Sequence, residues 1–358
     1  METNKILTVA VPTYNMERYL GRCLDSLILP KELMERLEVL VVNDGSKDKS
    51  SQIAHEYENR FPLTFRVIDK QNGNYGSCVN RALDEAKGKY FRILDADDRF
   101  NPETFPIFIQ ELSKADADMV LTHFCYISDC DEKKRTFLKK PENIEYGRLY
   151  KADEFSFSKD NREYLLSMHS ITYKLDILRK VGLRHQTGIS YTDTEYVYFP
   201  LVATKTILPI DLYLYLYTRE REGQTMSVKA KVKSLDAYYK VAHRLFLDYV
   251  ACNENKSDFS LRDKQLLILF KIVYGYYNIN LLYTERNEED NRMRQFYQEI
   301  KDNCPELLVL LRKETVRKVI YVFRIWERSG KYLTDQPYKS IYKFLTTLKG
   351  KSNKPITE

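Results

Sequence analysis

Residues Tyr90–Phe100 read YFRILDADDRF, and this stretch decides the fold. A short run of strand-forming residues follows Gly88 and ends in three carboxylates, Asp95, Asp97 and Asp98. The pattern predicts a buried strand with acidic side chains at its C-terminal end, where open α/β sheets place their ligand crevice. In extended backbone Asp95 and Asp97 project to the same side, whereas Asp98 points elsewhere and orients the turn.

Clustered carboxylates repel one another unless a cation neutralises them. Mg²⁺ and Mn²⁺ prefer oxygen ligands, often one or two carboxylates together with substrate phosphates. The acidic cluster therefore predicts a site for one of these ions, held by Asp95 and Asp97. A solvated Asp-rich turn before a helix at Pro102–Leu112 is the alternative, because Asp is favoured in turns and at helix starts.

The chain of 358 residues is 43% hydrophobic and 30% charged, which is typical of a soluble protein with a substantial core. Its six cysteines form no CxxC pair, so we expect neither a zinc site nor a disulfide framework, as in a reducing cytosol. The polar start Met1–Lys5 predicts no signal peptide. No apolar stretch suggests the roughly 20 residues of a membrane-spanning helix, and we expect a cytoplasmic protein.

Basic residues gather toward the C-terminus. Residues 229–358 contain 25 Lys and Arg against 16 Asp and Glu, and residues 312–358 contain 12 against 4. This asymmetry predicts peripheral contact with an anionic membrane face, with Tyr321, Phe323 and Trp326 among the cations. The favoured alternative for this apolar stripe is the core face of a packed helix. No nucleic-acid recognition motif accompanies the charge, so we expect no nucleic-acid partner.

The first hundred residues alternate strands with helices, which predicts a doubly wound, mostly parallel, Rossmann-like α/β sheet. Expected strands are Lys5–Val11, Leu37–Val42, Thr64–Ile68 and Tyr90–Leu94, and expected helices are Met16–Leu29, Ser50–Phe61 and one that follows Gln71–Gly76. Each strand ends in a polar cluster at the same edge of the sheet, in the outline of a nucleotide crevice. There Tyr14 is placed to stack on a base, Asp44 to accept a hydrogen bond from a ring N–H, and Arg81 to hold phosphate. Neither GxGxxG nor GxxxxGK[ST] occurs, so the acidic cluster is the evident phosphate anchor.

Three blocks in this region, VAVPTYNMERYLGRCLDSL, VLVVNDGSKDKS and NGNYGSCVNRALDEAKGKYFRILDADD, resemble the family-two inverting glycosyltransferases of the GT-A fold. The resemblance implies that the Pro-Thr-Tyr-Asn and Asp-Gly-Ser segments contact the nucleotide, and that the Asp-x-Asp binds the metal and the sugar diphosphate. The nucleotide-sugar contacts it implies are Pro12, Thr13, Tyr14, Glu17, Asp44, Asn74, Arg81, Asp95, Ala96 and Arg221, with Asp95 and Asp97 as metal ligands.

A second acidic block, GISYTDTEY at residues 188–196, resembles the signature in which this family carries its general base. Asp193 stands at the position of that base, and Thr192 stands where Glu is common. The alternative is that Asp193 only caps a helix at Thr194–Ala203. After a strand at Ile207–Tyr217, Arg219 and Arg221 resemble the basic loop that closes over the diphosphate, with a solvated loop as the alternative.

The remaining chain predicts helices. We expect a catalytic domain at residues 1–228, with a nucleotide-sugar half at 1–100 and an acceptor half at 101–228, and a basic helical domain at 229–358. The expected helices are Leu235–Val250, Arg262–Tyr283, Asn291–Lys301, Glu306–Arg328 and Pro337–Leu348.

The resemblance implies metal-assisted transfer of a sugar, with inversion, from a nucleotide sugar such as a UDP-sugar. The acceptor would be a hydroxyl of a glycan or lipid-linked saccharide, as in enzymes that build bacterial surface polysaccharides. Two alternatives stay open. A sugar-phosphate nucleotidyltransferase would share the sheet and the acids, and a non-catalytic nucleotide-sugar binding protein would share the crevice.

Overall fold

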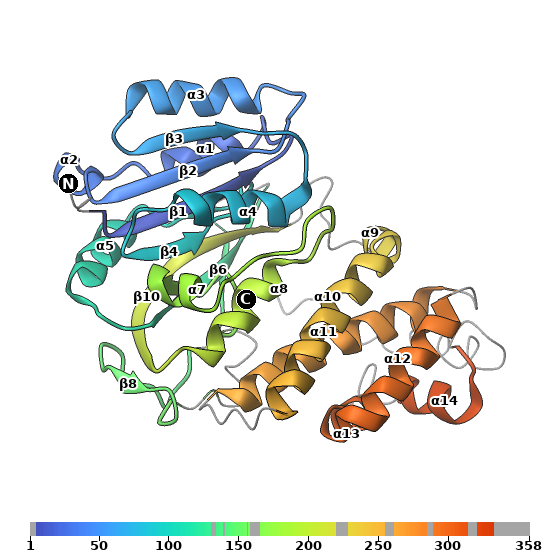
Figure 1. Ribbon diagram of the computed structural model, residues 1–358. Coiled ribbons are helices and arrows are strands. Elements are labelled where there is room, and N and C mark those ends of the chain that lie inside the picture. The colour runs from blue at the N-terminus through green and yellow to red at the C-terminus, as the bar shows by residue number, and fades with distance from the viewer. Residues whose placement is uncertain are drawn as a thin grey trace. The chain divides into compact units, whose positions relative to one another are not determined.

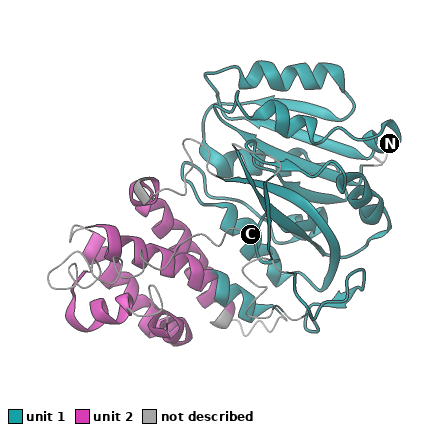
Figure 2. Cartoon of the chain, turned by 180° about the vertical axis from the view of Figure 1, so that it is seen from behind, with its two compact units in different colours: residues 1–223, 258–268 teal, residues 224–257, 269–358 magenta. Residues whose placement is uncertain are grey.

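The computed structural model describes residues 5–129, 134–138, 140–155, 157, 165–219, 228–254, 261–284, 289–313 and 321–332. The chain divides into two compact units, coloured separately in Figure 2. The first comprises Met1–Gly223 and Asp258–Ile268, and the second comprises Gln224–Ser257 and Leu269–Glu358. Residues 258–268, which the sequence assigns to the helical region, therefore group with the first unit.

The first unit is built on a sheet with the strand order β3-β2-β1-β4-β9-β6-β10-β5, while β7 pairs with β6 and β8 with β10 (Figure 1). The strands are β1 (Leu7–Thr13), β2 (Leu37–Asn43), β3 (Phe65–Asp69), β4 (Tyr90–Ile93), β5 (Arg99–Phe100), β6 (Met119–Ser128), β7 (Arg135–Phe137), β8 (Tyr150–Lys151), β9 (Ile171–Lys174) and β10 (Thr206–Arg219). The helices are α1 (Leu20–Asp25), α2 (Lys31–Met34), α3 (Ser50–Arg60), α4 (Asn74–Glu85), α5 (Phe105–Lys114), α7 (Leu175–Lys180), α8 (Asp193–Tyr198) and the 3₁₀ helix η1 (Phe199–Val202).

The direction of the strands places the functional edge. Strands β1, β2, β3 and β4 pair in parallel, and β10 pairs in parallel with β6. Strand β9 runs antiparallel to both β4 and β6, so β6 and β10 point the same way as β4. The C-terminal ends of six strands therefore lie at one edge of the sheet, as the predicted mostly parallel α/β fold requires.

The central strands form because their side chains are apolar on both faces. Every residue of β2 is buried, and so is every residue of β1 except the half-buried Pro12. Continuous burial of this kind is typical of parallel strands covered on both sides. The exception in β4 is Arg92, which is fully buried and donates to the hydroxyls of Thr122 (3.1 Å) and Thr172 (2.8 Å).

One predicted helix of the first unit is shorter than expected. The pattern over Met16–Leu29 predicts a single helix, but α1 covers only Leu20–Asp25 and α2 begins after Pro30. Asn15 adopts a positive φ of 53°, so the chain turns before it can enter a helix.

The second unit is helical, as predicted. Its described helices are α9 (Val228–Lys233), α10 (Leu235–Glu254), α11 (Arg262–Tyr283), α12 (Glu289–Asn303), α13 (Pro305–Lys313) and α14 (Val322–Ser329), with the first residues of α11 grouping in the first unit. The single helix predicted at Glu306–Arg328 is interrupted, because Tyr321 has a non-helical ψ of 72°. The predicted helix Pro337–Leu348 lies outside the described residues.

Two expectations about apolar segments need correction. Helix α11 has 22 residues and a mean hydropathy of 1.3 over its most apolar window. Among the described residues, one helix is therefore long and apolar enough to span a membrane, although 56% of that window is buried. Phe323 and Trp326 are also buried, and both rings pack on Tyr277. These two aromatic residues therefore belong to a packed helix face, the favoured alternative, and are not exposed for membrane contact. Tyr321 is 42% exposed.

Candidate functional site

The acidic loop follows β4 at the carboxyl edge of the sheet. Asp98 is buried, and both of its carboxylate oxygens accept hydrogen bonds, one from the Tyr215 hydroxyl (2.6 Å) and one from the Thr218 backbone N–H (2.7 Å). Burial, together with the charges of Asp97 and Asp95, raises the pKa of Asp98 well above its ordinary value. No cationic side chain pairs with Asp98 anywhere in the described part of the chain. The loop therefore brings the carboxylates of Asp95, Asp97 and Asp98 together at this edge of the sheet.

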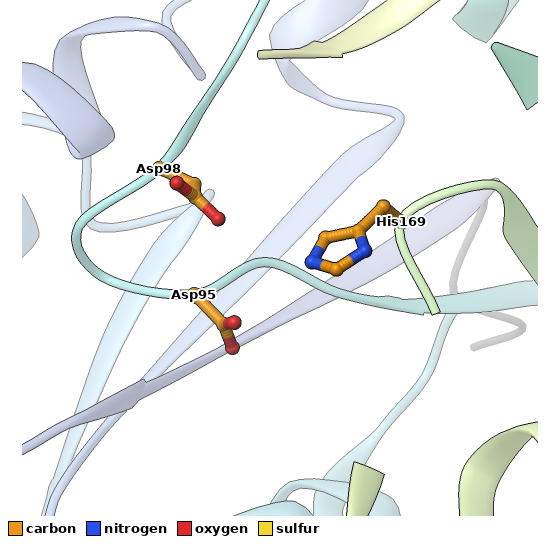
Figure 3. A group of neighbouring side chains, drawn as sticks. All are labelled: Asp95, Asp98 and His169. Carbon is orange, nitrogen blue, oxygen red and sulfur yellow. The ribbon is translucent and has the colours of Figure 1, made fainter. Parts of the chain in front are cut away.

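Two of these carboxylates meet an imidazole. Ligand atoms of Asp95, Asp98 and His169 lie within 4.8 Å of one another, and in Figure 3 the imidazole ring points toward the loop that carries both acids. The Nδ1 atom of His169 is 2.7 Å from the Ser167 hydroxyl, which leaves Nε2 for the acidic side. Burial and the nearby charge of Arg92 lower the pKa of His169 to about 3, so the ring is neutral. Two carboxylates and a neutral imidazole form a donor set that suits a divalent cation such as Mn²⁺.

The structure arranges the predicted metal residues differently from the sequence. Asp98, expected only to orient the turn, joins Asp95 and His169. Asp97, predicted as a ligand, is half-buried beside this group, and its carbonyl oxygen accepts a hydrogen bond from the Thr218 hydroxyl (2.8 Å). The role of Asp97 as a ligand stays a prediction.

Residues predicted to contact the nucleotide line the ends of β1 and β2. Asp44 is buried, and its Oδ1 accepts from Lys70 Nζ (2.5 Å) and from the Gly73 backbone N–H (2.9 Å). Tyr14 is 43% exposed, as a ring that stacks on a base would need to be. The Thr13 hydroxyl instead donates back to the Val11 carbonyl at 3.1 Å.

The other predicted contacts differ in their surroundings. The Glu17 carboxylate accepts the Lys49 backbone N–H at 3.0 Å and so ties the loop after β1 to the loop after β2. Asn74, with a positive φ of 68°, begins α4. Pro12 is half-buried within β1, Ala96 is buried within the acidic loop, and Arg221 lies outside the described residues.

The position of Arg81 does not support the predicted phosphate contact. Its side chain is exposed, and its Nε donates to Glu85 one turn further along α4 at 2.7 Å. The inward face of α4 carries apolar residues such as Val79 and Ala82, so helical spacing turns Arg81 outward. Sequence order placed it near the edge, but the helix phase directs it to solvent.

The predicted base begins helix α8. Asp193 is the first residue of that helix, and Thr192, at the N-cap position, makes no side-chain capping bond. Burial, reinforced by the charge of Glu195, raises the pKa of Asp193 above its ordinary value, against hydrogen bonds from backbone N–H groups. A carboxylate with a raised pKa is a stronger base, which suits proton abstraction.

Tyr75 links the two acidic regions. Its hydroxyl donates to Asp95 Oδ1 at 3.0 Å. Burial raises the pKa of Tyr75 well above its ordinary value, and the charges of Asp95 and then Asp193 add to the effect. The metal-type cluster and the candidate base therefore share one neighbourhood.

Sequence reasoning did not assign Tyr75, His169 or Arg92 to the acidic group, and it favoured a structural role for His169 over one in the acceptor pocket. Arg92 donates through Nη2 to the His169 backbone carbonyl and so helps to position the residue that carries the imidazole. The sequence signal for Arg92 was its charge inside an otherwise apolar strand, because a buried charged side chain requires hydrogen-bond partners.

The comparisons with known proteins bear on the family and the fold of this chain. Residues 8–181 match the family model for glycosyl transferase family 2. This part of the chain belongs to that family. The match runs from β1 to α7. It therefore includes the ends of β1 and β2, the acidic loop and His169, whereas Asp193 lies beyond it.

Two curated relatives of the family 2 domain illustrate its range. The chain is 39% identical over 142 residues to an uncharacterised glycosyltransferase of Mycoplasma pneumoniae, an alignment that covers 39% of this chain and 45% of the relative. It is 37% identical over 102 residues to the minor teichoic acid biosynthesis protein GgaB of Bacillus subtilis, which covers 28% of this chain and 11% of that protein. The alignments thus span less than half the length of these two relatives.

Among solved structures, S. aureus TarS in complex with UDP-GlcNAc superposes with a TM-score of 0.60 at 20% identity, over 85% of this chain and 83% of that chain. This likeness shows a shared fold and confirms the predicted GT-A architecture with its helical C-terminal region.

Proposed function

We propose that this chain is an inverting glycosyltransferase that moves a sugar from a nucleoside diphosphate, most simply UDP, to a hydroxyl of an acceptor. The observation that carries the proposal is the Tyr75 neighbourhood, where a metal-type acidic cluster and a candidate base come together. Membership of residues 8–181 in glycosyl transferase family 2 supports the class of reaction. It also weighs against a nucleotidyltransferase.

The acidic loop would hold Mg²⁺ or Mn²⁺ through Asp95 and Asp97, with His169 and Asp98 completing the donor set. The metal would supply positive charge to offset the charge that develops on the departing diphosphate. Asp98 is already bonded at both oxygens, so its first task is to fix the loop. Asp44 and Tyr14 would bind the base, and Arg221 would contact the diphosphate.

Asp193 would act as the general base. The acceptor oxygen attacks the anomeric carbon, the bond from that carbon to the phosphate oxygen breaks, and the acceptor proton passes to the Asp193 carboxylate. The nucleoside diphosphate leaves with the bonding electron pair, and configuration inverts in this single displacement. No side-chain nucleophile is required.

The acceptor class follows from the relatives by analogy. GgaB is named as a teichoic acid biosynthesis protein, and TarS was solved with UDP-GlcNAc. We therefore propose a glycan or lipid-linked saccharide of the cell surface as acceptor. We place the enzyme in the cytoplasm, at the inner membrane face, where the basic residues of 312–358 would meet anionic lipid.

The test is a donor panel. The protein with Mn²⁺ is incubated with nucleotide sugars and acceptor saccharides, and the release of free nucleotide is measured. We expect Asp193→Asn to lower transfer by about 10²–10⁴-fold, the usual contribution of a general base, with unchanged UDP binding. Asp176→Asn is the control, because Asp176 also lies in the first turn of a helix of this unit but is exposed. Transfer at the parent rate in Asp193→Asn would move the base elsewhere.

A further inference from the structure

The segment between α7 and α8 is bonded to helix α4 through one side chain. Asn80 Oδ1 accepts the His185 backbone N–H at 2.7 Å, and Asn80 Nδ2 donates to the His185 carbonyl at 2.9 Å. The amide thus satisfies both backbone groups of a residue 105 positions away, as a neighbouring strand would. We call residues 185–188 the strap.

The strap lies directly against the first turns of α4. The Gly188 backbone N–H donates to the Gly73 carbonyl at 2.8 Å. A Cβ on Gly76 would come within 2.0 Å of the Gln186 carbonyl oxygen, so no side chain fits at that position. The approach is close enough that the strap and α4 cannot shift toward each other.

The strap is also bonded to helix α8 and its N-cap residue, next to the candidate base. Gln186 donates to both oxygens of Glu195, through its backbone N–H (2.8 Å) and through Nε2 (2.9 Å), and Glu195 is fully buried. His185 Nδ1 is 2.8 Å from the Thr192 carbonyl, which accepts its hydrogen bond. These bonds reach the residues on both sides of Asp193.

We propose that Asn80 is a positioning residue for sugar transfer, because it fixes the Asp193 end of α8 to the helix whose first turn carries Asn74 and Tyr75. The inference rests on the proposed function of Asp193 as the base. Asn80 touches no reacting atom. Its effect passes through His185 and Gln186 to α8, and displacements of about 1 Å at a reacting group can lower a rate by 10².

The matched pair of variants is Asn80→Ala and Asp84→Ala. Asp84 lies one turn further along α4 and pairs with Arg184 at 2.5 Å, so it joins the same two segments through an exposed ion pair. We expect Asn80→Ala to lower kcat for transfer by about 10–100-fold, with UDP affinity and donor KM within twofold of the parent. Asp84→Ala should leave all three unchanged. A parallel loss of kcat and UDP affinity in Asn80→Ala, or a kcat within twofold of the parent, would overturn the positioning role.

A second pair of variants tests the hydrogen bonds between the strap and α8. Glu195→Gln keeps an acceptor oxygen for Gln186, whereas Glu195→Ala removes both. We expect kcat to fall further in Glu195→Ala than in Glu195→Gln, and equal losses would contradict the bonded path.

Amide hydrogen exchange of the nucleotide-free protein separates this inference from the proposed function. Asn80→Ala should speed exchange in peptides covering 185–198 while the strands β1 and β2 keep their protection, and Asp84→Ala should not. Unchanged exchange over 185–198 overturns the strap. Faster exchange in a protein that transfers no sugar from any donor keeps the strap and rejects the glycosyltransferase proposal.

Discussion

Asp98 in the first unit and Asp290 in the second are both buried carboxylates that accept a hydrogen bond from a tyrosine hydroxyl. The pKa values of the two carboxylates are shifted in opposite directions. At Asp290 burial raises the pKa, but hydrogen bonds from Arg294 and Trp326 and the Arg294 charge outweigh it, so the pKa lies below its ordinary value. At Asp98 burial is joined by two further acids, and the pKa is raised.

The difference separates a carboxylate with its own cationic partner from one for which we propose a functional role. Asp290 is neutralised by a cation of its own helix, so the helical unit needs no further charge there. Asp98 instead lies beside the charges of Asp97 and Asp95, which add to the effect of burial on its pKa. A divalent cation would neutralise such a cluster of carboxylates, which is the physical basis for the proposed metal.

The largest expected effect tests the proposed metal. With Mn²⁺ present the parent should bind UDP at least tenfold more tightly than in EDTA, because even second-sphere partners of a metal contribute about 10–100-fold. Asp97→Ala and Asp95→Ala should bind UDP weakly, with the same affinity in Mn²⁺ and in EDTA. Asp290→Asn, the control from the other unit, should keep the metal dependence. Calorimetry measures the UDP affinity of all four proteins. Equal UDP affinity of the parent in Mn²⁺ and in EDTA would contradict the proposed metal role.

The next effect concerns stability. Asp290→Asn should lower the free energy of unfolding by about 2 kcal/mol, because it removes charge-assisted hydrogen bonds at a buried site. Asp302→Asn is the control, since it makes the same change at an exposed position of α12. Urea unfolding compares the two, and an equal midpoint for both variants would show that Asp290 is not a stabilising charge.

Removing the cation from Asp290 should make it resemble Asp98. Arg294 is half exposed, so Arg294→Ala should cost only about 0.5–1 kcal/mol at pH 7. A carboxylate whose pKa is lowered by folding contributes stability above its unfolded pKa of about 3.9 and loses it as pH falls through the folded value. Variant and parent should therefore converge in acid, once the pH lies below the folded pKa of Asp290. Urea unfolding at pH 7 and in acid measures this, and a penalty that grows in acid would contradict the assignment.

The smallest effect has the opposite sign. Because the pKa of Asp98 is raised, its ionisation disfavours the folded chain above the unfolded pKa of about 3.9, and stability rises as pH falls through the folded value. In metal-free protein Asp98→Asn should leave stability at pH 7 unchanged or higher, by less than about 0.5 kcal/mol. A clear loss in urea unfolding would mean that Asp98 is stabilised by its partners as Asp290 is.

The sheet and its acidic loop could be predicted because their signals are local. Apolar runs that end in polar clusters mark parallel strands, and the Asp-x-Asp stands at the end of one of them. Asp193 was found through a resemblance, since its sequence neighbours alone describe only a helix start.

The remaining residues could not be predicted because they depend on pairings between distant segments. His169 precedes a strand, and the rule used on the sequence looks for function after strands. Arg81 seemed close to the edge by count, but the phase of α4 directs it outward. Asn80 and His185 are 105 positions apart, and no pattern in either segment announces the hydrogen bonds between them.

The reversed direction of β9 has a consequence for where this protein can accept new sequence. The parallel strands have their C-terminal ends at the edge that carries the acidic loop. Strand β9 has its N-terminal end there, because it runs antiparallel to β4 and β6. Extra length inserted before β9 would lie at the edge that carries the acidic loop, and extra length after Lys174 at the opposite edge. A designer who wishes to add sequence at this edge without disturbing the parallel strands would therefore lengthen the chain before Ser167 and keep Ser167 and His169 in place.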